Sequence, residues 1–409
     1  MRLLLLPTLL LPLLLAAQLD QRLESIQVIQ QADMQIRLGN TEQAYFLYTR
    51  AIETDPSFAD AYMKRATLLT RLGQYRQASE DMDRALLLNP MSDHILDSRA
   101  KLRILLNDPE GAELDIRQAM VLAPYDPLLR RERVDEWLEL GRTDLALLEL
   151  DTLLGEAPGD AGLKLKRGFV LLEADEPSPA LVVAEGILAA DPKNALAHDL
   201  RGMALIRLGR PAEALEAFSS AIGLSPEFAL AHYNRGVANR ALGNAPEALA
   251  DLQRAVELSG DQAHFLFQRA QVRRDAGDLE GAVADYDAAL KLDPAMTAVR
   301  YDRGVALKLL GDHAGAMRDA EELVERTPDD PQAWNMKGDL HLLFGEYVEA
   351  VDHYDRAISL DPEASEHLHD KGLALVMNYQ LLQGCRDLER AIDMGSERAR
   401  EAHANFCSF

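Results

Sequence analysis

The chain has two residues that could form a covalent cross-link, Cys385 and Cys407, and no other cysteine among its 409 residues. Gly395 and Ser396 lie midway between them and predict a turn between two helices. If the helices fold back antiparallel at this turn, the two cysteines lie level with each other. We expect a disulfide, because such pairs form in exported proteins. Two buried free thiols are the alternative.

The other residues with potential for chemistry do not form a recognisable site. His367 and His369 are close in sequence, but no cysteine or carboxylate ligand stands at the spacing of a zinc site. The sequence also lacks a G-x-S-x-G motif, a phosphate-binding loop and an H-E-x-x-H motif. We therefore expect no metal, no cofactor and no catalytic residue. An enzyme of envelope or polymer metabolism is the less favoured alternative.

The acidic composition limits the classes of partner. The formal net charge is −24 at pH 7, whereas phosphate binding needs clustered Lys and Arg, so a nucleic-acid partner is not expected. The acidic residues are spread along the chain and predict a solvated surface that keeps a long chain in solution. An acidic surface that recruits basic partners is the alternative.

The stretch 331–364 predicts two helices joined by a turn. Gly345 permits the turn, and Pro362 ends the second helix because a residue before proline is pushed out of the helical region. Neither helix can bury its apolar face alone, so the pair needs neighbours on both sides. The residues that share one face are Trp334, Gly338 and Leu342 on the first helix and Ala350, Tyr354, Ala357 and Ile358 on the second.

The same pattern recurs at a constant interval from Ser25 to Arg398, which defines repeats 1 to 11. Positions within a repeat are numbered from its first residue. We expect residues 18–24 to be a lead-in and residues 399–409 a helix that caps the last repeat. The repeats begin at residues 25, 59, 93, 127, 161, 195, 229, 263, 297, 331 and 365, and ten of them have alanine at position 20.

This pattern resembles the tetratricopeptide repeat (TPR), a helix–turn–helix unit of about 34 residues. Lys337 and His341 are departures from it in repeat 10. The resemblance implies an all-α fold, a right-handed superhelical solenoid of stacked antiparallel helix pairs. It also implies a non-catalytic scaffold that binds a protein or an extended peptide in a concave groove. A structural component that assembles by lateral or end-to-end packing is the alternative.

A basic residue at position 7 recurs together with an acid at position 23, as in Arg65 and Asp81. Because the two helices fold back around the turn, we expect an ion pair within each repeat, with the Arg stem along the helix interface. Val183 and Ala217 replace the acid in repeats 5 and 6. A row of ligand-binding arginines is the alternative.

The resemblance also indicates which residues face the groove, because the first helix of each TPR lines it. Repeats 7 to 9 have aromatic residues at position 5 and basic residues at position 12, which place both kinds on one helix face. We expect these six residues to form a recognition strip for an extended peptide with acidic and apolar residues. Structural packing of the aromatic residues is the alternative. The strip comprises Tyr233, Phe267 and Tyr301 with Arg240, Arg274 and Lys308.

Residues 1–17, MRLLLLPTLLLPLLLAA, combine one arginine, a leucine run and two final alanines, as in a secretory signal peptide. The apolar run of about 15 residues contains two prolines and is short for a membrane span. We expect cleavage before Gln18, a periplasmic or secreted protein, and no transmembrane span in the mature chain. Leu15 stands where signal peptides prefer a small residue, so retention as an N-terminal anchor is the alternative.

Cleavage of the leader is tested by the intact mass of the protein isolated from its native host. The expected result is a mass that begins at Gln18, together with a larger species when signal peptidase is inhibited. A native protein that keeps Met1 would contradict cleavage and support the anchor.

Overall fold

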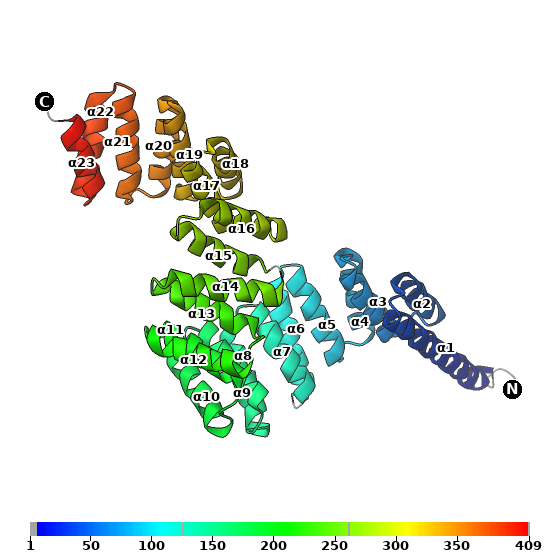
Figure 1. Cartoon of the computed structure of the whole chain (residues 1–409). Helices are drawn as coiled ribbons and strands as arrows, with labels where there is room; N and C mark the ends of the chain where they lie inside the picture. Colours follow the sequence, from blue (N-terminus) through cyan, green and yellow to red (C-terminus); the bar gives the residue numbers. More distant parts are fainter. Residues whose placement is uncertain (1–5, 125, 261, 408–409) are drawn as a thin grey trace. The chain divides into compact units, whose positions relative to one another are not determined.

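The computed structural model describes residues 6–124, 126–260 and 262–407, and in these ranges the chain forms helices and turns without strands. Consecutive helices pack as pairs, as α21 and α22 do in Figure 1. The predicted all-α fold of stacked helix pairs is confirmed. Across the same ranges, no helix combines the length and the apolar character needed to cross a membrane.

The chain forms two compact parts, residues 1–183 and 184–409, and the division falls inside α10 (Pro177–Ala190). In the first part, α1 continues from the predicted leader through the lead-in into repeat 1. The helices of this part are α1 (Leu6–Arg37), α2 (Thr41–Thr54), α3 (Ala59–Arg71), α4 (Tyr75–Leu88), α5 (Asp93–Leu105), α6 (Pro109–Leu122), α7 (Pro127–Glu139), α8 (Thr143–Glu156) and α9 (Ala161–Glu173).

In the second part, odd-numbered helices up to α21 are the first helices of repeats and even-numbered helices the second. The last helix begins at Glu397, just before the start of the predicted cap, and residues 408–409 lie outside the described ranges. The helices of this part are α11 (Ala195–Arg207), α12 (Pro211–Leu224), α13 (Ala229–Ala241), α14 (Ala245–Ser259), α15 (Ala263–Asp275), α16 (Leu279–Leu292), α17 (Thr297–Leu310), α18 (His313–Arg326), α19 (Pro331–Phe344), α20 (Tyr347–Leu360), α21 (Ser365–Met377), α22 (Leu381–Asp393) and α23 (Glu397–Phe406).

The turn inside each helix pair needs a residue with positive φ at position 15. Eight repeats supply glycine, such as Gly345 at φ 78°. Repeats 3, 5 and 11 instead place Asn107, Asp175 and Tyr379 at φ 58°, 57° and 60°. Asn and Asp tolerate this region, whereas a tyrosine costs about 1–2 kcal/mol there. The turn geometry is therefore imposed by the helix packing even where the sequence lacks glycine.

Small residues allow the two helices of a pair to approach closely. A Cβ atom added to Gly338 would lie 2.6 Å from the ring of Tyr354, and one added to Gly202 would lie 2.5 Å from the ring of Phe218. These aromatic rings are fully buried, as is Ala350 on the facing helix. The aromatic residue at position 24 thus fills the space that glycine at position 8 leaves open.

The predicted ion pair within the repeat is confirmed in six repeats. In repeat 11, Nζ of Lys371 lies 3.3 Å from Asp387. In the other five, the Arg at position 7 donates from Nε and Nη2 to both oxygens of the Asp at position 23. In repeat 8, the Nε of Arg269 lies 2.8 Å from Oδ2 of the buried Asp285. The five pairs are Arg65–Asp81, Arg99–Asp115, Arg235–Asp251, Arg269–Asp285 and Arg303–Asp319.

The same arginine also reaches the second helix of the preceding repeat. Nη1 of Arg303 lies 2.6 Å from Asp287, which belongs to α16. In repeat 5, where the acid of position 23 is missing, Arg167 bonds to Asp151 of repeat 4 at 2.6 Å. The residue at position 7 therefore connects three helices, and the prediction of a pair confined to one repeat was incomplete.

Repeat 4 departs from this arrangement, and the predicted pair of Arg133 with Glu149 was wrong. Glu149 lies 3.5 Å from Arg130, while Nε of Arg133 lies 3.7 Å from Asp97 of repeat 3. Arg130, a second arginine at position 4 of this repeat, lies beside Glu149 instead.

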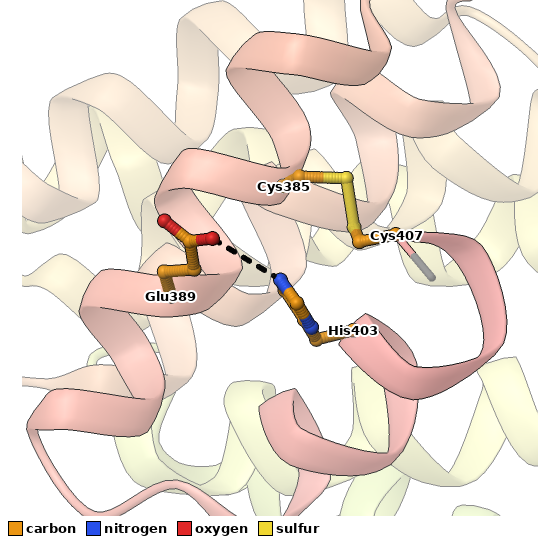
Figure 2. Close-up of a disulfide and its surroundings, with 4 residues drawn as sticks. All are labelled: Cys385, Glu389, His403 and Cys407. Carbon is orange, nitrogen blue, oxygen red and sulfur yellow. Dashed lines mark hydrogen bonds and ion pairs between the residues drawn. A yellow bond between two sulfur atoms is a disulfide. The ribbon is translucent and has the colours of Figure 1, made fainter. Parts of the chain in front are cut away.

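The C-terminal helix pair is closed by a disulfide between Cys385 of α22 and Cys407, just after α23 (Figure 2). The two Cα atoms lie 5.7 Å apart. Gly395 supplies the turn at φ 94°, and the Ser396 hydroxyl accepts a hydrogen bond from the Ala399 amide at the start of α23. The antiparallel turn proposed from the cysteine spacing is the one that the structure contains.

We predict that the protein, purified and unfolded in denaturant without reductant, contains no thiol that reacts with Ellman's reagent. The loop of 22 residues corresponds to about 3 kcal/mol of loop entropy. Because each repeat contacts only its neighbours, reduction should increase amide exchange in α22 and α23 and leave α11 to α14 unchanged. Two reactive thiols per chain would contradict the disulfide. Cys407→Ser, treated in the same way, is the matched control for reduction.

Candidate functional site

The first helices of successive repeats lie side by side and form a continuous wall within each compact part. Contacts join α3 to α5 and α5 to α7 in the first part, and α11, α13, α15 and α17 in sequence in the second. The side chains at positions 5, 6, 9, 12 and 13 of these helices meet those of the next repeat. This wall, called the groove wall below, is the surface on which the predicted strip lies.

Polar pairs cross the groove wall between residues that are 31 positions apart. Because this separation is slightly shorter than the repeat, each pair joins neighbouring helices about one turn out of register. Carboxylates or amides accept from Lys, Arg or Gln in every case. The pairs are Asp33–Lys64 (3.0 Å), Lys101–Glu132 (2.5 Å), Asp135–Lys166 (2.5 Å), Arg240–Gln271 (2.8 Å), Gln271–Asp302 (2.8 Å) and Lys308–Asp339 (2.7 Å).

The three aromatic residues of the predicted strip are half-buried between neighbouring repeats. The ring of Tyr233 stacks on Phe265 of the next repeat, with centroids 4.5 Å apart. The ring centroid of Phe267 lies 6.1 Å from that of Tyr286. Tyr301 packs against a group of buried apolar side chains in repeats 9 and 10. Much of each ring therefore stabilises the stack, and only the remaining surface is open to a ligand.

The three cations of the strip are already paired with carboxylates. Arg240 and Arg274 share Asp275, at 3.2 and 3.1 Å, and Nη1 of Arg274 also lies 2.8 Å from Asp302. Lys308 pairs separately with Asp339. The strip therefore presents no net positive charge, which removes the reason to prefer an acidic ligand.

The sequence contained a signal for these acidic partners that residue-by-residue inspection of the strip did not detect. Asp339 stands 31 residues after Lys308, and Asp275 stands 35 residues after Arg240. A search for opposite charges at these two separations would have found both of these acids, but not Asp302, which stands 31 residues after the neutral Gln271. Their pairing depends on the register between neighbouring repeats, which a scan within one repeat does not use.

A hollow of about 650 Å³ opens on the groove wall in repeats 9 to 11. Positions 2, 5, 6, 9, 12 and 13 of repeats 10 and 11 contain three acids and no Lys or Arg. Leu309, Leu343 and Met377, all at position 13, are exposed along this stretch. The residues that line the hollow are Lys308, His313, Asn335, Asp339, Leu342, Leu343, Glu366, Asp370, Leu373 and Arg398.

Two buried carboxylates of the groove wall in the second part accept hydrogen bonds from side-chain amides. Asp370 accepts from the Asn335 amide at 3.2 Å and lies 2.8 Å from the ring of His369. Asp199 is fully buried and accepts from the Asn234 amide at 2.9 Å. Burial raises the pKa of Asp199 to about 6, because its single neutral partner only partly offsets the loss of water. The predicted strip begins beside this buried acid.

No cluster of three or more His, Cys, Asp or Glu residues able to hold a metal occurs among the residues that the structure describes. His367 and His369, the two histidines that are close in sequence, are both buried. Nδ1 of His367 lies 2.8 Å from Oδ1 of Asn335. They belong to the packing between repeats 10 and 11.

Comparison with protein families found the tetratricopeptide repeat at two places in the chain. One family profile matches residues 200–263, 267–331 and 310–365, and a second profile of the same description matches residues 35–102. Together these matches cover more than half of the chain. A search of curated protein sequences found no significant match.

Solved structures with the same fold share little sequence with the chain. The Cut9–Hcn1 hetero-tetramer of the APC/C matches 93% of this chain and 89% of its own, at 14% identity and a TM-score of 0.52. Yeast Tom70 matches 92% and 86% at 17% identity and a TM-score of 0.42. YrrB, described as a TPR protein with an unusual peptide-binding site, matches 46% and 97% at 19% identity and a TM-score of 0.42.

Proposed function

Because the chain belongs to the tetratricopeptide repeat family, we propose that it is a non-catalytic scaffold that binds a protein or an extended peptide on its groove wall. The observation that carries this proposal is the hollow in repeats 9 to 11, which brings exposed apolar side chains together with three carboxylates and two cations, Lys308 and Arg398, on one face. TPR proteins in general mediate protein–protein interactions. Those in the comparisons share only the fold with this chain.

The bound segment would run from the strip of repeats 7 to 9 into the hollow. Along the strip, the open edges of the three aromatic rings supply rigid apolar contacts at low entropy cost. In the hollow, Glu366 and Asp370 favour a cationic group, and Leu343 favours an apolar side chain. We propose an extended segment with apolar residues and at least one Lys or Arg, in place of the acidic peptide expected from the sequence. The negative charge of the whole chain favours the same choice.

We also propose that this scaffold acts outside the cytoplasm, in the periplasm or after secretion. The leader pattern of residues 1–17 supports export. The disulfide between Cys385 and Cys407 supports it independently, because disulfides persist mainly in oxidising compartments.

The groove proposal is tested by selecting binders from a display library of random peptides and measuring their affinity by fluorescence anisotropy. The expected peptides combine apolar residues with Lys or Arg. Each single substitution, Tyr233→Ala, Phe267→Ala or Tyr301→Ala, should weaken peptide binding by about five- to thirty-fold, or about 1–2 kcal/mol. The helical circular dichroism spectrum should stay unchanged. Glu366→Gln should weaken the binding of basic peptides and reduce its salt dependence.

The matched control is Phe46→Ala, which removes an exposed aromatic residue from a second helix, away from the groove wall. Loss of binding in this control, with no effect of the strip or hollow variants, would contradict the assignment. A uniformly acidic selected set would contradict the proposed ligand chemistry but leave the groove as the site.

A second candidate function, lateral assembly, is favoured by an exposed apolar area formed by α6 and the turn before α5 in the first part. Val121 is 80% exposed and Met91 72%, and with Leu114 they border a hollow of about 380 Å³. Exposed apolar areas on soluble proteins commonly mark interfaces. At the positions of Leu114 and Val121 within the repeat (22 and 29), the second part has mostly charged residues, which include Glu257, Lys291, Arg318, Glu325, Asp352 and Asp393.

Lateral assembly predicts a concentration-dependent dimer, measured by sedimentation velocity, that the double variant Leu114→Glu/Val121→Glu abolishes. Buried carboxylates at the centre of such an interface would be unpaired and costly. Arg318→Glu, which changes the charge at position 22 of the second part, serves as the control. A wild-type chain that stays monomeric at all concentrations would contradict this candidate.

A further inference from the structure

Position 10 of the repeat is apolar in ten of the eleven repeats and acidic in one, repeat 4, where Glu136 stands. The side chain is only 3% exposed, so it lies in the same interior environment as most of its apolar counterparts. An ionised carboxylate in that environment is costly unless it is paired and hydrogen-bonded. The apolar residues at this position are Met34, Leu68, Leu102, Val170, Ala204, Ala238, Val272, Ala306, Leu340 and Ala374.

Glu136 on α7 shares its interior site with Asp97 on α5, which is also 3% exposed. None of the four carboxylate oxygens has a hydrogen-bond partner among the described residues. The nearest cations are Lys101, whose Nζ lies 3.7 Å from Glu136, and Arg133, whose Nε lies 3.7 Å from Asp97. These distances permit attraction but exceed hydrogen-bond length. We call the buried Asp97, Glu136 and Arg133, together with the exposed Lys101 at their edge, the buried cluster.

Both cations of the buried cluster donate hydrogen bonds to groups outside the cluster. Lys101 donates to Glu132 at 2.5 Å, one of the pairs that cross the groove wall. Arg133 is itself 1% exposed and, within the part of the chain that the structure describes, donates only to the Ala123 carbonyl, at 3.5 Å. In five other repeats the Arg at position 7 makes two hydrogen bonds to the acid at position 23, but here Arg130 lies beside that acid. The buried cluster therefore has balanced charge and poor hydrogen bonding.

Burial is the main influence on both carboxyl groups and raises the pKa of Asp97 to about 6 and that of Glu136 to about 7. Asp97 is also affected by Arg133 and Lys101, which lower its pKa, and by Asp93 and Glu132, which raise it. For Glu136, the charges of Asp97 and Glu132 raise the pKa further, whereas the charges of Lys101 and Arg133 lower it. On α8, Glu149 faces Arg130 and Arg133, and its own pKa is raised by burial.

The sign of the pH dependence follows from these directions. A carboxyl group whose pKa is higher in the folded than in the unfolded chain binds protons more tightly when folded. Its contribution to the stability of the folded state is fully present at acidic pH and is lost as the pH rises through the pKa of the folded state. The contact between α5 and α7 should therefore weaken between about pH 4 and pH 7.

We propose that the contact between repeats 3 and 4 is a pH-sensitive joint in the array, closed when Asp97 and Glu136 are protonated and loosened when both are ionised. Because each repeat contacts only its neighbours, a weakened contact opens the stack locally without unfolding the remaining repeats. The groove wall passes over this joint through the Lys101–Glu132 pair. Opening would separate the groove wall of repeats 1 to 3 from that of repeat 4.

The joint is tested by hydrogen exchange with mass spectrometry on the full chain at about pH 5 and about pH 8, corrected for intrinsic exchange rates. Protection of α5 and α7 should fall by at least about tenfold from the lower to the higher pH, since one pKa unit corresponds to a factor of ten. The matched region is α15 and α17, which contact each other in the same way and have Val272 and Ala306 at position 10. Protection there should change by less than about twofold.

The double variant Asp97→Asn/Glu136→Gln keeps the shape of both side chains and should remove the pH dependence of α5 and α7. Glu136→Leu restores the apolar residue found at this position in other repeats, so it should fold and raise protection at about pH 8. Glu132→Gln, which changes an exposed acid beside the same lysine, should retain the dependence. Equal exchange in the two regions of the wild type, or a dependence that persists in both Glu136 variants, would overturn the proposal.

Discussion

The basic residue at position 7 is the constraint on which the stack depends. Its stem lies between two helices of one repeat, and its guanidinium reaches a third helix from the repeat before, as Arg303 does with Asp319 and Asp287. Two parallel hydrogen bonds to one carboxylate fix the orientation of the planar group. A lysine can make the same ion pairs but not the same fixed fork, and Lys371 occurs at the C-terminal end, where the disulfide adds a second restraint.

The groove wall follows from the same register. Once the position 7 residue sets the offset between neighbouring repeats, side chains of adjacent first helices face each other, and their charges cancel in pairs. Most cations that look available in the sequence are therefore structural. Recognition then rests on what the pairing leaves over: open aromatic edges in repeats 7 to 9, and apolar side chains with excess carboxylate in repeats 10 and 11.

The repeats are similar in backbone but not in the chemistry of their contacts. Repeat 4 has Glu136 at an interior position, and its Arg133 does not pair with the acid at position 23 as arginines at this position do in five other repeats. With Asp97 of repeat 3, these residues form a contact that is polar, buried and poorly hydrogen-bonded. In an array where stability is the sum of local contacts, such a contact decides where the stack opens first.

The sequence alone determined the helices, their turns and their pairing, because these depend on local spacing: glycine at position 15, small residues at positions 8 and 20, and the base at position 7 with the acid at position 23. It also indicated the Cys385–Cys407 pairing, since both cysteines flank one turn. Only the tertiary structure decided that Arg240, Arg274 and Lys308 are paired and that Asp97 and Glu136 are both buried beside Lys101 and Arg133. Those contacts join residues of different repeats, and their charges and burial depend on the register between helices that no single repeat specifies.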